Sequence, residues 1–157
     1  MGAGAVLSIS LGGPNQFSQL TVKNYIQYGG TLNVTLANGY TPAIGTQFEI
    51  ITNGSSGSGF ATVNVPQGIS LTYSIAGVYL TVTGAVPAQV ISPQLSGGNF
   101  GFSFGTVNGQ SYTVEQNTNL ATPNWTFDTN ITGNGLPYQA ILPVTNTPGT
   151  FFRVSEP

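Results

Sequence analysis

The charged side chains are the first place to look for chemistry, because acid–base catalysis and metal binding both depend on them. The 157-residue chain has only six, and it has no histidine and no cysteine. The commonest general base, the thiol nucleophile and the usual zinc ligands are therefore absent. The six are Glu49, Glu115, Asp128 and Glu156 among the acids, and Lys23 and Arg153 among the bases. We expect no enzyme, no cofactor and no metal centre.

Lys23 and Glu49 are the only charged residues in the first half of the chain. One hypothesis is a crosslink, in which a buried lysine condenses with an asparagine while a carboxylate moves the proton. That chemistry needs an apolar site, where desolvation keeps the amine neutral and the acid protonated. The alternatives are an ion pair between the two residues or two unrelated surface charges.

Aromatic side chains are the second set with recognisable chemistry, since their rings stack on sugars. We expect core packing for Trp125 and for Phe100, Phe102 and Phe104, which alternate along one predicted strand. The candidates for contact with a glycan are five tyrosines: Tyr25, Tyr28, Tyr40, Tyr79 and Tyr138.

These residues must be positioned by β-strands, because no stretch shows the apolar spacing of a helix. Short runs of alternating apolar and polar residues lie between turn signals, and the chain holds 22 glycines. This pattern predicts an all-β protein. The predicted strands are 5–10, 19–23, 31–36, 47–52, 59–63, 69–75, 78–83, 89–92, 100–104, 111–115, 125–128, 139–142 and 150–154.

The turns are marked by glycine. Four Asn-Gly pairs begin at Asn38, Asn53, Asn108 and Asn134, and they predict turn positions with positive φ. A turn at Ala76-Gly77 would place Ile75 opposite Val78 and Tyr73 opposite Leu80, unless a bulge shifts this register.

The proline-containing segment 85–88 separates two stretches that differ in their apolar and aromatic residues. Apolar residues before it are mainly Leu, Val, Ile and Tyr, whereas Phe and Trp dominate after it. We therefore predict two β modules, 1–84 and 89–157, joined by a linker over 85–88.

Five sequence blocks in the first module keep a recognisable order and spacing. They are FSQLTV (17–22), GGTLNVTL (29–36), NGYTP (38–42), GTQFEII (45–51) and GFAT (59–62). Over about 15–84 this order resembles the closing segment of bacterial autotransporter-like, β-helical passenger proteins. The resemblance implies a capping module, and we expect it to be either β-helix-like or sandwich-like.

The second module carries GQSYTVE (109–115), TNL (118–120), NW (124–125), GNG (133–135) and a closing FFRV (151–154). Over about 88–157 it is similar to a C-terminal β-sandwich module of large secreted proteins of Verrucomicrobia and Planctomycetes. The resemblance implies an immunoglobulin/fibronectin-like sandwich. Neither resemblance brings a catalytic residue with it.

The N-terminal stretch contains an apolar strand whose candidate assembly residues are Ala5, Val6, Leu7, Ile9 and Leu11. This strand pairs within its own module by default, or it adds to the sheet of a second subunit. Natural proteins guard such edges with charge and proline, and charged residues make up only 4% of this chain.

Two basic residues cannot neutralise a run of phosphates, so we expect no nucleic-acid partner. We also expect no membrane insertion, because no apolar run reaches the length of a span. The segment before Leu7 has no basic residue, so an export signal is not expected within this chain. The sequence favours an extracellular structural protein of the bacterial surface, which forms or terminates a stalk or self-assembled fibre. The alternative is a carbohydrate-binding or adhesive module.

Overall fold

The computed structural model describes residues 2, 4–24, 26–52, 59–144 and 149–156. Every regular element in these residues is a β-strand, so the all-β prediction is confirmed. The described part contains no helix long and apolar enough to cross a membrane. The chain divides into two compact units, Met1–Val86 and Pro87–Pro157, and the division falls within the predicted linker. We call them unit 1 and unit 2.

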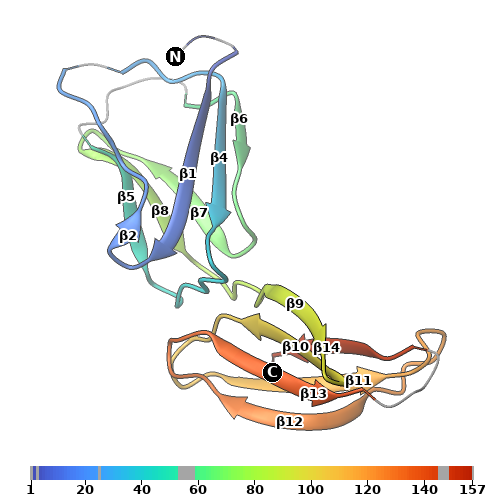
Figure 1. Cartoon of the computed structure of the whole chain (residues 1–157). Helices are drawn as coiled ribbons and strands as arrows, with labels where there is room; N and C mark the ends of the chain where they lie inside the picture. Colours follow the sequence, from blue (N-terminus) through green and yellow to red (C-terminus); the bar gives the residue numbers. More distant parts are fainter. Residues whose placement is uncertain (1, 3, 25, 53–58, 145–148, 157) are drawn as a thin grey trace. The chain divides into compact units, whose positions relative to one another are not determined.

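Unit 1 consists of two four-stranded sheets that face each other (Figure 1). The order in the first sheet is β2 (Gln16–Phe17), β1 (Val6–Gly13), β4 (Thr31–Leu36) and β6 (Thr62–Asn64). The order in the second sheet is β3 (Leu20–Thr21), β5 (Gln47–Thr52), β8 (Gly77–Val82) and β7 (Ile69–Tyr73). The predicted strands at 31–36 and 47–52 are confirmed at both ends, whereas the two-residue β2 was not predicted.

Parallel pairing joins the strands that are far apart in sequence. In the first sheet β1, β4 and β6 all run in the same direction, and in the second sheet β3 is parallel to β5. Antiparallel pairing is confined to β2 and to the hairpin of β7 and β8, which adds to β5. The chain thus passes from one sheet to the other five times, and the last passage leads into the hairpin that closes one side of the second sheet.

The core of unit 1 lies between the two sheets and is built from alternate residues of each strand. Leu32 and Val34 point inward from β4, while Asn33 and Thr35 point outward, as their alternation predicts. A bulge in β5 buries both Ile50 and Ile51. The other fully enclosed core side chains are Ile9, Leu11, Phe48, Val78, Leu80 and Val82.

The predicted register of the β7–β8 hairpin is wrong by two residues. Tyr73 lies opposite Val78 rather than Leu80, and Ile75 sits in the turn, 92% exposed. The Ser74 hydroxyl accepts the N–H groups of Ala76 and Gly77, which centres the turn on Ile75-Ala76. Gly77 is needed within the strand instead, because a Cβ there would lie 2.5 Å from the carbonyl oxygen of Ile51.

Unit 2 is a sandwich of two three-stranded antiparallel sheets. One sheet has the order β13 (Tyr138–Pro143), β10 (Asn99–Phe104) and β9 (Val90–Ser96). The other has the order β12 (Thr126–Thr132), β11 (Ser111–Asn117) and β14 (Phe151–Ser155). The buried core consists of Phe102, Phe104, Tyr112, Val114, Ala140 and Leu142.

Two further expectations for the chain can be checked here. Asn38 and the glycines at 39, 109 and 135 have positive φ, as the Asn-Gly pairs predict, and the pair at Asn53 lies outside the described residues. The core prediction is confirmed for Phe102 and Phe104, and Phe100 packs against them. It is wrong for Trp125, which lies outside the buried cluster against a basic side chain.

Candidate functional site

The predicted assembly strand is built into its own sheet. Residues from Val6 to Leu11 pair in register with Thr31 to Leu36, and the carbonyl oxygen of Ala5 accepts the N–H of Thr31 at 2.9 Å. This is the default arrangement expected from the sequence. Ile9 and Leu11 are buried, while Val6 is 57% exposed and Leu7 packs at the margin of the core.

The backbone of β1 has a second edge that faces away from β4. In a parallel ladder the N–H and C=O of one residue point to one neighbouring strand, and those of the next residue point to the other side. The carbonyl oxygens of Ala5 and Leu11 accept the N–H groups of Thr31 and Ala37, at the start of β4 and just after its end, so the odd-numbered residues of β1 face that strand. The backbone groups of Val6, Ser8 and Ser10 therefore face the outer edge.

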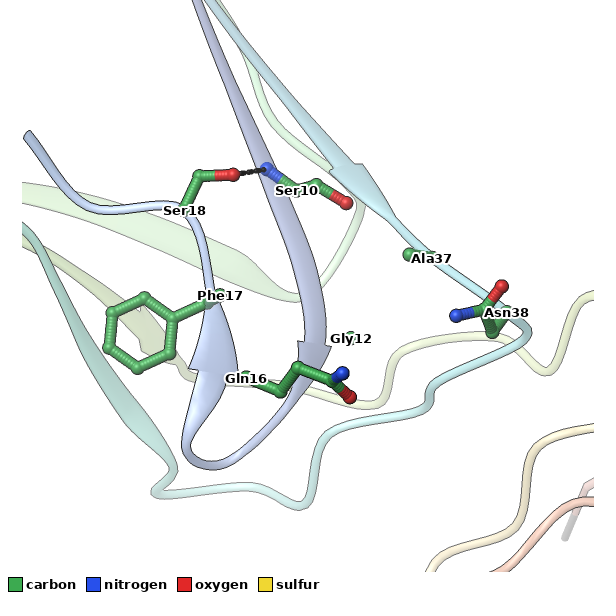
Figure 2. A pocket seen from close by; sticks show the side chains of 7 residues that line it. All are labelled: Ser10, Gly12, Gln16, Phe17, Ser18, Ala37 and Asn38. Carbon is green, nitrogen blue, oxygen red and sulfur yellow. Dashed lines mark hydrogen bonds between the residues drawn. The ribbon is translucent and has the colours of Figure 1, made fainter.

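A short hairpin covers only the second half of this edge (Figure 2). Ser18 donates its N–H to the carbonyl of Ser10 at 2.9 Å, and its Oγ accepts the Ser10 N–H at 3.1 Å. Beyond it, β2 pairs Phe17 with Leu11. Beside the hairpin is an open hollow of about 310 Å³, lined by Ser10, Gly12, Gln16, Phe17, Ser18, Ala37 and Asn38.

The described residues of unit 1 leave the first half of the edge uncovered. No strand in the described part of the chain pairs with the outward groups of Val6 and Ser8. No charged or proline residue lies between Val6 and Gly13 to protect it. In the second sheet β3 is the outermost strand and lies next to β5. Figure 1 shows β5 on the same side of unit 1 as β2 and β1. We call β1 and β3 together the N-terminal edge.

The opposite side of unit 1 is closed differently. β6 is only three residues long and pairs with Thr31–Asn33, and the Asn64 side-chain amide donates to Asn33 Oδ1 at 2.7 Å. In the second sheet the β7–β8 hairpin adds two antiparallel strands beyond β5. The two sides therefore differ in both the number and the direction of their strands.

The structure does not bring Lys23 and Glu49 together. Lys23 is exposed just after β3, and no ion pair joins it to Glu49 in the described part of the chain. The Glu49 carboxylate instead accepts a hydrogen bond from Tyr79 at 2.9 Å. This bond is the main cause that raises the pKa of Tyr79, and burial and the negative charge of Glu49 add to it. The crosslink hypothesis gains no support, because Lys23 lacks an apolar enclosure.

The five candidate tyrosines do not form a common platform. Tyr28 is 5% exposed and packs against Phe60, so it belongs to the core rather than to a glycan-binding surface. Tyr40 is half-buried against Phe48, and burial raises its pKa. Tyr138 packs on Phe104 in unit 2. Tyr25 lies outside the described residues, and Tyr79 is occupied by Glu49 as described above.

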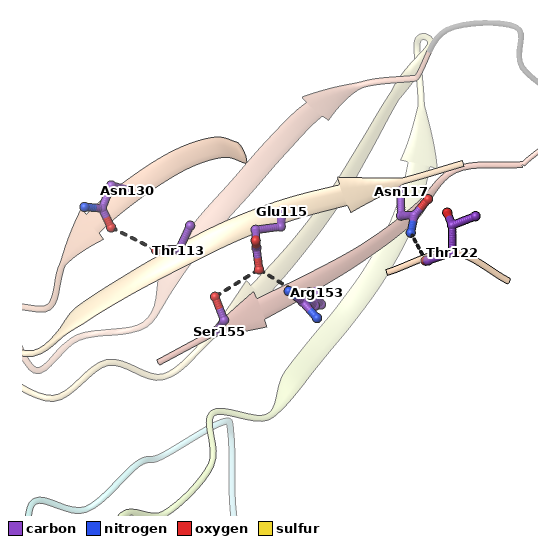
Figure 3. Close-up of polar contacts among 7 residues, drawn as sticks. All are labelled: Thr113, Glu115, Asn117, Thr122, Asn130, Arg153 and Ser155. Atoms are coloured by element: carbon purple, nitrogen blue, oxygen red, sulfur yellow. Dashed lines mark hydrogen bonds and ion pairs between the residues drawn. The ribbon is translucent and has the colours of Figure 1, made fainter. Parts of the chain in front are cut away.

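The best-organised polar group lies on the outer face of the β12–β11–β14 sheet (Figure 3). Arg153 Nε lies 2.8 Å from Glu115 Oε2, and the Ser155 hydroxyl donates to the same oxygen at 3.1 Å. The guanidinium also lies 4.3 Å from the ring centre of Trp125, within the range of a cation–π contact. The hydrogen bond from Arg153 is the main cause that lowers the pKa of Glu115, with a further lowering from Ser155.

Two exposed rings share this face. Phe127 is level with Glu115 across β11 and β12 and is 63% exposed. Phe151 lies two residues before Arg153 on β14 and is 42% exposed, so its side chain points to the same side. Sequence reasoning missed this face because it assigned Trp125 to the core. The alternation Trp125-Thr-Phe127 was the signal available.

The carboxylate of Glu156 takes part in the packing of unit 2. Glu156 accepts the Ala88 N–H and the Gln110 side-chain amide, both at 2.9 Å, and so fixes the end of unit 2. Among the described residues no group of three or more acidic, histidine or cysteine side chains could hold a metal ion. Two open hollows in unit 2, of about 380 and 270 Å³, are lined by uncharged side chains.

Comparison with known proteins identifies no relative. No family model matches the sequence, and neither a curated protein nor a solved structure matches it.

Proposed function

We propose that the protein is a structural component of the bacterial cell surface, which forms or terminates a stalk or self-assembled fibre by β-strand pairing. The observation that carries this proposal is the N-terminal edge. The outward backbone groups of Val6 and Ser8 are uncovered in the described chain, and the strand that presents them has no charged guard. Such an edge is a template for another strand.

The arrangement of unit 1 supports a role at the end of a stack. Its parallel pairs β1–β4, β4–β6 and β3–β5 support a comparison with the coils of a short β-helix. The antiparallel β7–β8 hairpin then closes one side. We therefore assign unit 1 as a β-helix-like capping module, whose open end joins another β-rich body. A location outside the cell is supported by the two sequence resemblances.

Unit 2 supports the proposed role in a stalk or fibre. Its sheets β13–β10–β9 and β12–β11–β14 have the strand order of the E-B-A and C′-C-F sheets of a fibronectin type III sandwich. We assign it as an immunoglobulin/fibronectin-like module on this order. In the proposed function this sandwich acts as a spacer or an adhesive module.

The test is the size of the protein in solution when the outer edge of β1 is blocked. Proline at position 8 removes an N–H that faces away from β4, so Ser8→Pro spares the internal ladder. Ser8→Thr keeps the N–H and is the matched control. We expect the wild type and Ser8→Thr to associate as concentration rises in sedimentation velocity, and Ser8→Pro to stay monomeric with an unchanged circular dichroism spectrum. A wild type that is monomeric at every concentration would overturn the proposal.

The outer face of unit 2 favours a second candidate, the binding of a surface glycan. Trp125, Phe127 and Phe151 supply rings, and Glu115 and Arg153 supply hydrogen-bonding groups on the same flat face. Sugar-binding surfaces combine these two features. Glycan-array binding that is lost in Phe127→Ala would support this function. Leu136→Ala, which removes a side chain 64% exposed elsewhere in unit 2, is the control.

A further inference from the structure

We propose that Asn134 is a site of spontaneous chemical modification, at which the side-chain amide is lost as ammonia and the residue becomes isoaspartate or aspartate. This inference goes beyond the proposed function and does not depend on it. Asn134 lies in the loop 133–137, which joins β12 to β13. Two features of that loop carry the inference: a glycine follows the asparagine, and a hydrogen bond folds the asparagine side chain over the turn.

The reaction needs only the chain itself and water. The backbone nitrogen of Gly135 loses its proton to solvent base and attacks the carboxamide carbon of Asn134, so that a new C–N bond forms. The C–N bond of the side-chain amide breaks, and the departing nitrogen takes up a proton and leaves as ammonia. One water molecule then opens either carbonyl of the resulting cyclic imide. The products are aspartate, and isoaspartate in which the main chain runs through the side-chain carbon.

The Asn134 carboxamide is held where this attack can occur. Its Oδ1 accepts the N–H of Leu136 at 3.0 Å, and this Asx turn folds the side chain over the intervening Gly135. The same hydrogen bond draws electrons away from the carboxamide carbon. It also faces the oxygen on which negative charge develops during the attack, as the donors of an oxyanion hole do.

The attacking nitrogen is open to solvent. Asn134, Gly135 and Leu136 are all exposed, and the N–H of Gly135 donates to no acceptor in the described part of the chain. A Cβ added at Gly135 would meet only the Cβ of Asn108, at 4.0 Å. Base and water can therefore reach the reacting atoms, and glycine leaves the backbone free to rotate as the ring closes.

The other described Asn-Gly pairs each lack an available nucleophile. Gly109 donates its N–H to the carbonyl oxygen of Gly133 at 2.8 Å, so the nitrogen that follows Asn108 is already bound. Gly39 is buried, which shields the nitrogen that follows Asn38 from solvent base. The same sequence signal thus has different consequences at the three places.

A comparison within the chain isolates the part played by glycine. Asn119 is exposed, and its Oδ1 accepts the N–H of Ala121 at 3.0 Å, in the same kind of turn as at Asn134. The residue that follows is Leu120, whose branched side chain crowds the nitrogen and restricts the rotation that closes the ring. Among the described residues, only Asn134 combines this turn with a following glycine.

The modification would loosen the link between the two sheets of unit 2. The Asn134 N–H donates to Thr106 Oγ1 at 3.3 Å, and this buried hydroxyl donates to the carbonyl of Leu136 at 2.7 Å. Isoaspartate lengthens the main chain by one carbon between these two anchors. The product also carries a new carboxylate, which lowers the formal net charge of −2 by one. We expect faster hydrogen exchange at Leu136 and an unchanged rate at Val114 in the buried part of β11.

The test follows each site in the folded and the unfolded protein. The wild-type chain is incubated in mildly alkaline buffer with and without concentrated urea, and peptide mapping by mass spectrometry measures the products at each asparagine. In the folded protein Asn134 should react at close to its rate in urea. Asn108 should be slowed about tenfold, the factor that corresponds to one hydrogen bond, and Asn38 should also be slowed. In urea these three should react at similar rates, while Asn119 should remain slow.

Two results would overturn the proposal. If folding slows Asn134 as much as Asn108, the loop protects both sites. If the order of the sites is the same in urea as in the folded protein, the sequence alone sets the rates.

The structural consequence has its own control. The modified wild type is separated by anion exchange, which resolves the added charge, and its hydrogen exchange is compared with that of the fresh protein. Asn134→Gln keeps a carboxamide, but its longer side chain closes the ring poorly, so incubation should leave its exchange pattern unchanged. Identical exchange at Leu136 in the modified and the fresh wild type would overturn the predicted loosening.

Discussion

Replacing Gly30 with alanine tests whether the start of β4 holds both parallel ladders of unit 1. Gly30 has a φ of 67°, and a Cβ there would overlap the carbonyl oxygen of Ala5. That oxygen accepts the first bond of the β1–β4 ladder, from Thr31. On the other side, the Gly30 carbonyl accepts the N–H groups of Ala61 and Thr62 at 2.9 and 3.1 Å. A shift of the backbone at Gly30 therefore disturbs both ladders.

The cost has two parts that can be estimated separately. A side chain in the left-handed region costs about 1–2 kcal/mol. Relief of the overlap moves the Ala5 carbonyl away from Thr31, and loss of one such hydrogen bond costs about 1 kcal/mol. We expect Gly30→Ala to lower the free energy of unfolding by roughly 2–3 kcal/mol. Guanidinium denaturation followed by circular dichroism measures the loss, and hydrogen exchange by mass spectrometry locates it.

Gly45→Ala is the matched control. Gly45 also has a positive φ, 88°, but a Cβ there would meet nothing within 4 Å. It should cost only the conformational part, about 1–2 kcal/mol. If Gly30→Ala is no more destabilising than Gly45→Ala, the crowding at Ala5 does not matter and the reasoning fails. Faster exchange at the start of β4 should appear in Gly30→Ala alone.

Three more outcomes follow from the structure. Ile75→Thr should change the free energy of unfolding by less than about 0.5 kcal/mol, because Ile75 lies in the exposed turn. Leu80→Ala should lower it by about 2–5 kcal/mol, because Leu80 is fully buried. Equal losses in denaturation would restore the rejected hairpin register. The lowered pKa of Glu115 stabilises unit 2 above the ordinary value of 4.5, and this contribution is lost as pH falls through the lowered pKa. Glu115→Gln should therefore flatten the acid limb of a thermal-melting profile, and an unchanged limb would show that the Arg153 pair is not coupled to folding. Tyr112→Phe should lower the free energy of unfolding by about 1–3 kcal/mol, because the backbone N–H of Val107 donates to the Tyr112 hydroxyl at 2.8 Å and would lose this partner. A neutral effect in urea denaturation would contradict this.

Local patterns in the sequence predict the strands well but not their partners. The alternation of Leu32 and Val34 with polar residues gives both the extent and the inward face of β4. Nothing in that alternation says that β1 lies beside it, because parallel pairing depends on contacts between distant segments. The two-residue β2 is too short to leave a pattern, although it decides how much of the outer edge of β1 is covered.

The errors in the candidate sites have local physical causes. The hairpin register fails because Ser74 caps the turn with its hydroxyl, which no apolar pattern reveals. Tyr28 looks like a surface residue in a polar segment, yet it is enclosed by Phe60 and Tyr73. Trp125 is of a residue type that is usually buried in a core, but the guanidinium of Arg153 stacks on its ring. In each case a partner distant in sequence, or a single polar atom, outweighs the residue's own preference.

The stack of Arg153 on Trp125 also gives the protein an internal optical probe. Trp125 is the only tryptophan in the chain, and it lies in unit 2 with a positive charge beside its indole ring. Fluorescence excited at a wavelength that only the indole absorbs therefore reports on unit 2. The signals of tyrosine and phenylalanine come from both units. Replacing Arg153 removes the adjacent charge and should shift the emission wavelength without any added dye. Unfolding of unit 2 can thus be followed by itself in an unlabelled sample of the whole protein.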